Sequence, residues 1–94
     1  MAMRLTEQQI ADELASLEWQ RVDDAMIREW KLADFGAAMT FVNEIAALAE
    51  EADHHPDILV HGYHRVRVTL TTHFVNGLTA RDFELARRID RLGT

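Results

Sequence analysis

The chain has 94 residues, with 10 Lys or Arg against 16 Asp or Glu and a formal net charge of −6, which predicts one domain over residues 1–94. The acidic charge argues against nucleic-acid binding, and the lack of cysteine excludes disulfides, thiolate nucleophiles and iron–sulfur ligation. No apolar run approaches the about 18 residues of a membrane span and the start lacks a signal-peptide core, so we expect a cytoplasmic protein that does not contact membranes.

The first third of the chain predicts one helix and two strands. Thr6, with Gln9 three residues later, is typical of a capping box, so we expect a helix from Thr6 to Ser16. Between Trp19 and Leu32, two short runs flank Asp23-Asp24, a pair that favours a turn. The second run partly alternates between apolar and polar residues, which indicates paired strands.

A long helix is predicted from about Asp34 to Asp53. It carries two neighbouring apolar stripes, formed by Phe35, Met39, Val42, Ala46 and Ala49 and by Ala38, Phe41, Ile45 and Leu48. This apolar arc is wider than packing on one sheet requires. The excess indicates a partner subunit, or else it is covered by the first helix.

The last part of the chain predicts a hairpin and a helix. Ile58–His61 and Arg65–Thr72 flank a turn at Gly62, and the second strand alternates so that His73 would continue its polar row if no bulge intervenes. Asn76-Gly77 predicts a turn, after which Thr79 can cap a helix that has Asp82 at its third position and that buries Phe83, Ala86 and Ile89.

The resulting order, α-β-β-α-β-β-α, predicts an α+β fold. Strands joined by short turns favour a four-stranded antiparallel sheet with the helices packed on one face. The opposite face would be open, and the polar row that includes His73 would point to it.

All the histidines lie in one stretch of the chain, at His54, His55, His61, His64 and His73. Carboxylates just upstream, together with the C-terminal end of the long helix, favour a protonated imidazole at the first two. Such a group can donate a proton near neutral pH, while a histidine in a different environment accepts one.

Three interpretations of this cluster remain open. The histidines can be solvated polar residues or caps, which we favour for His61 and His64 because they flank the turn. They can bind a metal, although no His-x-x-x-His pair lies on one helical face and the adjacent His54 and His55 do not easily converge. They can also perform acid–base catalysis without a cofactor.

The same stretch resembles the signature of the pterin-4a-carbinolamine dehydratase family. That signature is a charged residue, three positions, His, His or Asn, Pro, five or six positions, an aromatic, nine positions, His or Trp, and an Asp at least eight positions later. The chain meets it with Glu50, His54-His55-Pro56, Tyr63, His73 and Asp82. Thr71-Thr72-His73 and Gly77-Leu78-Thr79 are also similar to the family, and the order of elements fits its fold.

The resemblance implies a hydro-lyase that needs neither cofactor nor metal. Its substrate would be 4a-hydroxytetrahydropterin, the 4a-carbinolamine, which loses water to give quinonoid dihydropterin in tetrahydrobiopterin recycling. The activity would be coupled to an aromatic amino acid hydroxylase. The family also implies a homodimer or a dimer-of-dimers tetramer.

Carried over by position, the resemblance implies that His54, His55 and His73 are catalytic. His55 would be the acid at the hydroxyl group, with His54 or His73 as the base. The substrate site would be lined by Pro56, Thr72, Phe74 and Val75, and the supporting residues would be Glu50, Asp53 and Asp82. For Asp82, in the first turn of a helix, capping is the favoured role.

The chain departs from animal members of the family at two positions, and two alternative functions remain open. Phe74 and Ile58 stand where animal members commonly have an acidic residue and a Trp, which affects contacts at the edge of the substrate. Animal relatives also serve as dimerisation cofactors for a homeodomain transcription factor, so one alternative is a binding module that docks through its long helix. A metal-binding regulator is the other alternative.

Overall fold

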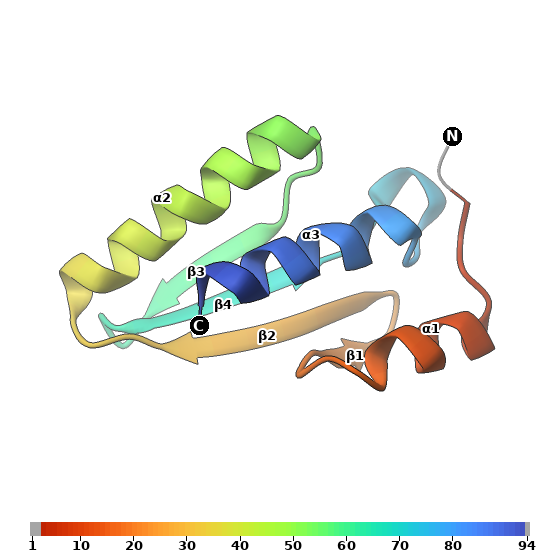
Figure 1. The fold of residues 1–94 in the computed structure, drawn as a ribbon, viewed down its shortest axis with the longest axis horizontal. Coiled ribbons are helices and arrows are strands. Elements are labelled where there is room, and N and C mark those ends of the chain that lie inside the picture. Colours follow the sequence, from red (N-terminus) through yellow and green to blue (C-terminus); the bar gives the residue numbers. More distant parts are fainter. Residues whose placement is uncertain (1–2, 94) are drawn as a thin grey trace.

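The computed structural model describes residues 3–93 and confirms the predicted α+β class. Its elements are α1 (Glu7–Leu14), β1 (Gln20–Val22), β2 (Ala25–Lys31), α2 (Phe35–Ala52), β3 (Asp57–His61), β4 (Arg65–Leu70), the 3₁₀ helix η1 (His73–Val75) and α3 (Ala80–Leu92). The strands form one antiparallel sheet in the order β1-β2-β4-β3. The helices α2 and α3 cover one face of it, and α1 lies at the β1 edge (Figure 1). Within residues 3–93 no helix combines the length and apolarity needed to cross a membrane.

The alternation in β4 separates the two faces of the sheet. Val66, Val68 and Leu70 are fully buried beneath the helices, whereas Arg65 and Arg67 are exposed on the open face. The helix-facing residues of β2 pair with those of β4 in register, so that Met26 lies opposite Leu70 and Trp30 opposite Val66. The core therefore forms a single layer between the sheet and the helices.

Local capping fixes the start of each helix. Thr6 and Thr79 form capping boxes with Gln9 and Asp82 at α1 and α3, as the sequence predicts. The prediction that α1 continues to Ser16 is wrong, because the helix ends at Leu14. The chain leaves the helix there and reaches buried Trp19, whose Nε1 donates a 2.9 Å hydrogen bond to Asp90 in α3.

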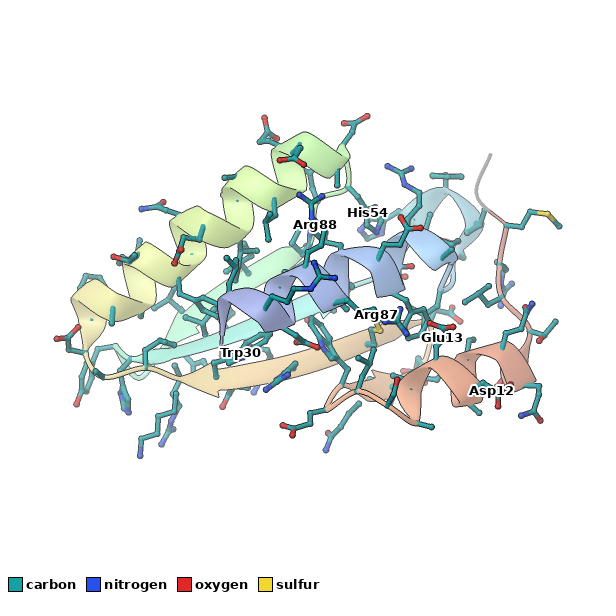
Figure 2. All side chains as sticks on the ribbon, in the orientation of Figure 1. Asp12, Glu13, Trp30, His54, Arg87 and Arg88 are labelled. Atoms are coloured by element: carbon teal, nitrogen blue, oxygen red, sulfur yellow. The ribbon has the colours of Figure 1, made fainter. Side chains whose placement is uncertain are left out.

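Two consecutive arginines join α3 to the other helices. Arg87 binds Glu13 of α1 at 2.6 Å, and Arg88 binds Glu51 of α2 at 2.7 Å. Figure 2 shows these two side chains leaving α3 in different directions. The three helices are thus linked by ion pairs as well as by the core.

The end of β4 differs from the sequence prediction. The strand stops at Leu70, Thr72 forms only an isolated bridge with Gly77, and His73 begins η1. The prediction that His73 continues the polar row of the open face is therefore wrong. The chain turns because the Thr72 hydroxyl bonds to α3, and because Asn76, in the left-handed conformation at φ 52°, returns the backbone to Gly77.

Candidate active site

The centre of the candidate site is a buried histidine–aspartate pair. His54 follows the left-handed C-cap of α2, Asp53, and only 8% of it is exposed. Its Nε2 lies 2.6 Å from Oδ1 of Asp82, which is completely buried in the first turn of α3. Figure 2 places His54 between the end of α2 and the start of α3. The pair therefore connects these two helices.

The second oxygen of Asp82 is also fully engaged. Oδ2 accepts hydrogen bonds from the Thr79 backbone N–H at 2.9 Å and from the Thr72 hydroxyl at 2.8 Å. The capping role that the sequence favours is present, and the same carboxylate also holds His54. Asp82 thus joins the start of α3 to two of the predicted site segments.

Arg81 is a supporting residue that the sequence analysis does not identify. Its Nη2 donates to the carbonyl oxygens of Asp53, at 2.5 Å, and Ala52, at 3.4 Å. These carbonyls belong to the end of α2, where the last carbonyl groups have no partner within the helix. No local pattern points to this contact, because Arg81 and its partners are 28 and 29 positions apart.

His55 lies in an environment opposite to that of His54. Its side chain is 58% exposed, and its Nε2 is 2.5 Å from Oε2 of Glu50, which lies on the last turns of α2. Glu50, predicted to be a supporting residue, therefore contacts a histidine directly. Two adjacent histidines thus have carboxylate partners, one pair buried and the other in solvent.

The third predicted catalytic histidine, His73, is exposed and opens η1. It directly follows Thr72, which is only 1% exposed and is anchored by Asp82, so the backbone at His73 is fixed beside the His54–Asp82 pair. Phe74, in the same turn, is 65% exposed. The remaining predicted lining residues, Pro56 and Val75, are half-buried.

The two histidines kept outside the predicted site lie at the end of β3 and in the β3–β4 turn, and each has a partner. His61 binds Glu29 across the sheet at 2.7 Å, and this hydrogen bond lowers the pKa of the Glu29 carboxyl. His64 Nδ1 is 2.7 Å from the carbonyl oxygen of Gly62. Both contacts fit the structural roles favoured for these residues.

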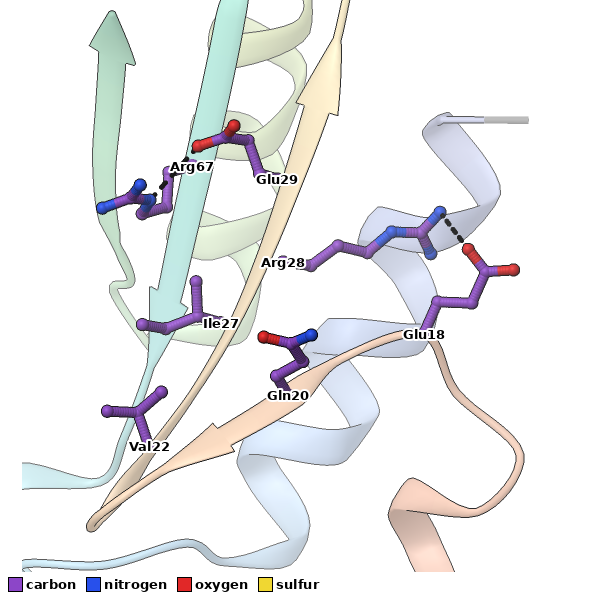
Figure 3. A pocket seen from close by; sticks show the side chains of 7 residues that line it. All are labelled: Glu18, Gln20, Val22, Ile27, Arg28, Glu29 and Arg67. Atoms are coloured by element: carbon purple, nitrogen blue, oxygen red, sulfur yellow. Dashed lines mark hydrogen bonds and ion pairs between the residues drawn. The ribbon is translucent and has the colours of Figure 1, made fainter.

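Two concavities differ in their relation to the histidines. One of about 70 Å³ lies beside His54 and is lined by Ala52, His54, Arg81, Glu84, Leu85 and Arg88. Another of about 520 Å³ is lined by Glu18, Gln20, Val22, Ile27, Arg28, Glu29 and Arg67 (Figure 3). The second contains none of the predicted site residues. Among residues 3–93, no three histidine, aspartate or glutamate side chains are grouped so as to hold a metal ion.

The fold and this arrangement define a class of protein: a small α+β domain with a buried His–Asp pair beside an exposed His–Glu pair. An imidazole held by a carboxylate has a fixed orientation, and imidazole exchanges protons near neutral pH. The arrangement is therefore suited to proton transfer.

Comparisons with known proteins identify the family. The model of the family described as pterin 4 alpha carbinolamine dehydratase matches residues 3–92. A relative from Chloroflexus aurantiacus, provisionally named as such a dehydratase, is 48% identical over 90 residues, covering 95% of this chain and 96% of its own length. A relative from Picosynechococcus with the same provisional name is 46% identical over 93 residues, covering 98% of this chain and 100% of its own.

A solved structure agrees with this assignment. The crystal structure of a transcriptional coactivator/pterin dehydratase from Brucella melitensis matches with a TM-score of 0.92 and 40% identity, covering 98% of this chain and 100% of that one. The chain belongs to the pterin-4a-carbinolamine dehydratase family, whose named members are hydro-lyases.

Proposed function

We propose that this chain, acting as a single domain, dehydrates 4a-hydroxytetrahydropterin to quinonoid dihydropterin by histidine acid–base catalysis. The observation that carries the proposal is the contrast between two adjacent histidines. His54 is buried against Asp82, and His55 is exposed against Glu50. Groups of one type in different environments are suited to opposite proton-transfer roles.

The reaction needs one proton donor and one proton acceptor. The C4a–O bond breaks with its electron pair, and the departing oxygen takes a proton from the acid to leave as water. The base removes the proton from N5, and the N–H electron pair forms the C4a=N5 double bond. The reaction involves no change of oxidation state, so these two proton transfers balance it.

We assign the acid role to His55 and the base role to His54, with His73 as a further contact to the pterin. The carboxylate of Glu50 is a suitable partner for a charged imidazole that gives up a proton. The concavity beside His54, at about 70 Å³, is smaller than the roughly 300 Å³ of a small-molecule site. The pterin would therefore bind on the exposed side, at His55, His73 and Phe74, with Pro56 and Val75 lining the site and with N5 at the exposed edge of His54.

The test is the dehydration rate of freshly generated 4a-hydroxytetrahydropterin, followed by ultraviolet absorbance. Wild type is compared with His55→Ala and His73→Ala, and His61→Ala is the matched histidine control because its partner lies on the open face. We expect a loss of at least about a hundredfold in each site variant and no loss in the control.

Circular dichroism serves as the control that each variant is folded. A folded wild type that does not accelerate the reaction over buffer would refute the enzymatic proposal. Equal losses in His61→Ala and the site variants would refute the assignment of the site. If the reaction needs no metal, metal analysis should find no stoichiometric metal in the purified protein. Chelator treatment should then leave the activity unchanged.

The proposed substrate places the chain after a reaction that hydroxylates a tetrahydropterin at C4a. We therefore propose a role in tetrahydrobiopterin recycling in the cytoplasm, coupled to an aromatic amino acid hydroxylase. Substrate supplied by a purified hydroxylase should be consumed faster when this protein is added.

A second candidate function is a binding module that docks through α2. Phe35 and Met39, on this helix, are 55% and 36% exposed, and the Brucella relative is described as a coactivator as well as a dehydratase. Of the two roles for this exposed surface, docking to another protein or self-association, we propose that α2 serves self-association into a homodimer or a dimer-of-dimers tetramer. Light scattering tests this choice, because a chain that stays monomeric would leave α2 free for another partner.

A further inference from the structure

A chain of buried hydrogen bonds leads from two threonines to His54. The hydroxyl oxygens of Thr79 and Thr72 are 2.9 Å apart, and the Thr72 hydroxyl is 2.8 Å from Oδ2 of Asp82. Oδ1 of the same carboxylate is 2.6 Å from Nε2 of His54. The two threonines are no more than 1% exposed, so water does not compete for these groups.

The direction of each hydrogen bond follows from the number of protons available. Asp82, as a carboxylate, only accepts, so the Thr72 hydroxyl must donate its one proton to Oδ2. The proton between the two threonines then comes from Thr79, whose oxygen also accepts from the Arg81 backbone N–H. At the other end, His54 Nε2 must carry the hydrogen that Oδ1 accepts.

This direction determines the tautomer of His54. A neutral imidazole carries one hydrogen, so an occupied Nε2–H leaves the lone pair on Nδ1. Successive hydrogen bonds in one direction polarise and strengthen each other. The Thr72 hydroxyl and the Thr79 N–H together keep the carboxylate from rotating, because both hold the oxygen that does not bind His54.

We propose that Thr72 is a positioning residue for the dehydration reaction: its hydroxyl orients Asp82 so that His54 keeps its hydrogen on Nε2 and accepts the substrate proton at Nδ1. This inference rests on the proposed function, and it changes the role of Thr72 from a residue that lines the substrate site to one that acts through His54. Its hydroxyl proton is already committed to Asp82 and cannot be donated to the pterin.

The test compares Thr72→Val, which removes the hydroxyl at nearly constant volume, with Thr72→Ser, which keeps it. Thr72→Ala is a second variant without the hydroxyl, in case valine prevents folding. Thr69→Val, on the open face of β4, is the matched control. Nitrogen-15 NMR of the His54 ring reports the tautomer without substrate, and steady-state kinetics separate kcat from KM.

We expect wild type, Thr72→Ser and Thr69→Val to show hydrogen on Nε2 alone. Thr72→Val and Thr72→Ala should show a mixture of tautomers and a kcat about tenfold lower, with KM within about twofold of wild type. Rescue by serine would show that the hydroxyl, and not the methyl group, carries the effect.

An unchanged tautomer in folded Thr72→Val and Thr72→Ala would overturn the inference. Equal losses of kcat in the serine and valine variants would also overturn it, because the hydroxyl that serine retains would then not preserve the activity. A tautomer shift in a protein whose wild type does not dehydrate the pterin would support the positioning of His54 and refute the proposed function, so the two failures are distinguishable.

Discussion

Replacing Asp82 by asparagine separates the charge of this buried carboxylate from its shape. Asparagine still offers one oxygen to the Thr79 N–H and the Thr72 hydroxyl. In the wild type these two groups donate to Oδ2 of Asp82 at 2.9 and 2.8 Å. Its NH₂ group would then face Nε2 of His54, where the carboxylate accepts a hydrogen bond at 2.6 Å. Because this NH₂ group is a donor, Nε2 must accept the hydrogen bond with its lone pair. The hydrogen of the neutral His54 ring then moves to Nδ1.

The expected cost in stability follows from these contacts. A hydrogen bond to a charged group contributes about 1.5–3 kcal/mol, against about 0.5–1.5 kcal/mol between neutral groups. Each of the two retained bonds therefore weakens by about 1 kcal/mol, and we expect Asp82→Asn to lower the unfolding free energy by about 2 kcal/mol. Asp82→Ala leaves three buried donors without a partner and should cost at least about 3 kcal/mol.

The same substitution is expected to lower the activity. With its hydrogen on Nδ1, His54 cannot accept the substrate proton there, so Asp82→Asn should lower the dehydration rate by about 10²- to 10⁴-fold while the protein stays folded. Urea denaturation followed by circular dichroism measures stability. Asp90→Asn is the matched control, because Asp90 lies on the same helix and accepts hydrogen bonds from Trp19 and Arg28 outside the site.

Two results would refute this reasoning. A folded Asp82→Asn variant with a rate within about threefold of wild type would show that the carboxylate does not set the role of His54. An equal loss of activity in Asp90→Asn would show that the effect follows from weakened packing of α3. Loss of stability in Asp90→Asn without loss of rate is the result that we expect.

Three further predictions concern stability. The hydrogen bond from His61 lowers the pKa of Glu29 below its ordinary value of 4.5, so this carboxylate stabilises the fold above that pH and the contribution is lost as the pH falls through the lowered pKa. Because Glu29 is exposed, urea titrations should show wild type at most about 1 kcal/mol more stable than Glu29→Gln at pH 6, with no difference once the carboxylate is protonated; a constant difference would contradict the assignment. Thr6→Ala removes the N-cap of α1 and should cost about 1 kcal/mol, measured by urea denaturation, whereas an unchanged value would mean that the cap adds nothing. Ile45→Ala empties a fully buried position of α2 and should cost about 2–5 kcal/mol by the same method, while Glu44→Ala, on the exposed side, should change it by less than about 0.5 kcal/mol.

The sequence predicts the features that depend on near neighbours. The capping boxes at Thr6 and Thr79 need only residues three positions apart, and β4 is recognised from the alternation of its buried valines. Its buried and open faces follow from the same alternation. The fold class is confirmed because each of these local signals agrees with the others.

Contacts between residues far apart in the sequence could not be predicted from local sequence patterns. The pairing of β2 with β4 joins segments about forty positions apart, and no composition rule specifies it. The turn after Leu70 depends on Thr72 bonding to Asp82, ten positions later, so alternation alone extends the strand too far. The signature identifies His54, His55, Glu50 and Asp82, and the structure adds which of them pair: His54 with Asp82 and His55 with Glu50.

Two neighbouring residues in the first turn of α3 hold the end of α2 and His54 in place. Arg81 binds the last carbonyls of α2, and the neighbouring Asp82 binds His54 while it accepts the Thr79 N–H of its own helix. Moving Asp82 away would release His54 and break a helix cap at the same time, which ties the geometry of the pair to local unfolding of this turn. The Thr79 amide hydrogen would exchange with solvent deuterium only when its hydrogen bond to Asp82 opens. Its exchange rate thus reports whether Asp82, the partner of His54, keeps its place even when no pterin is bound.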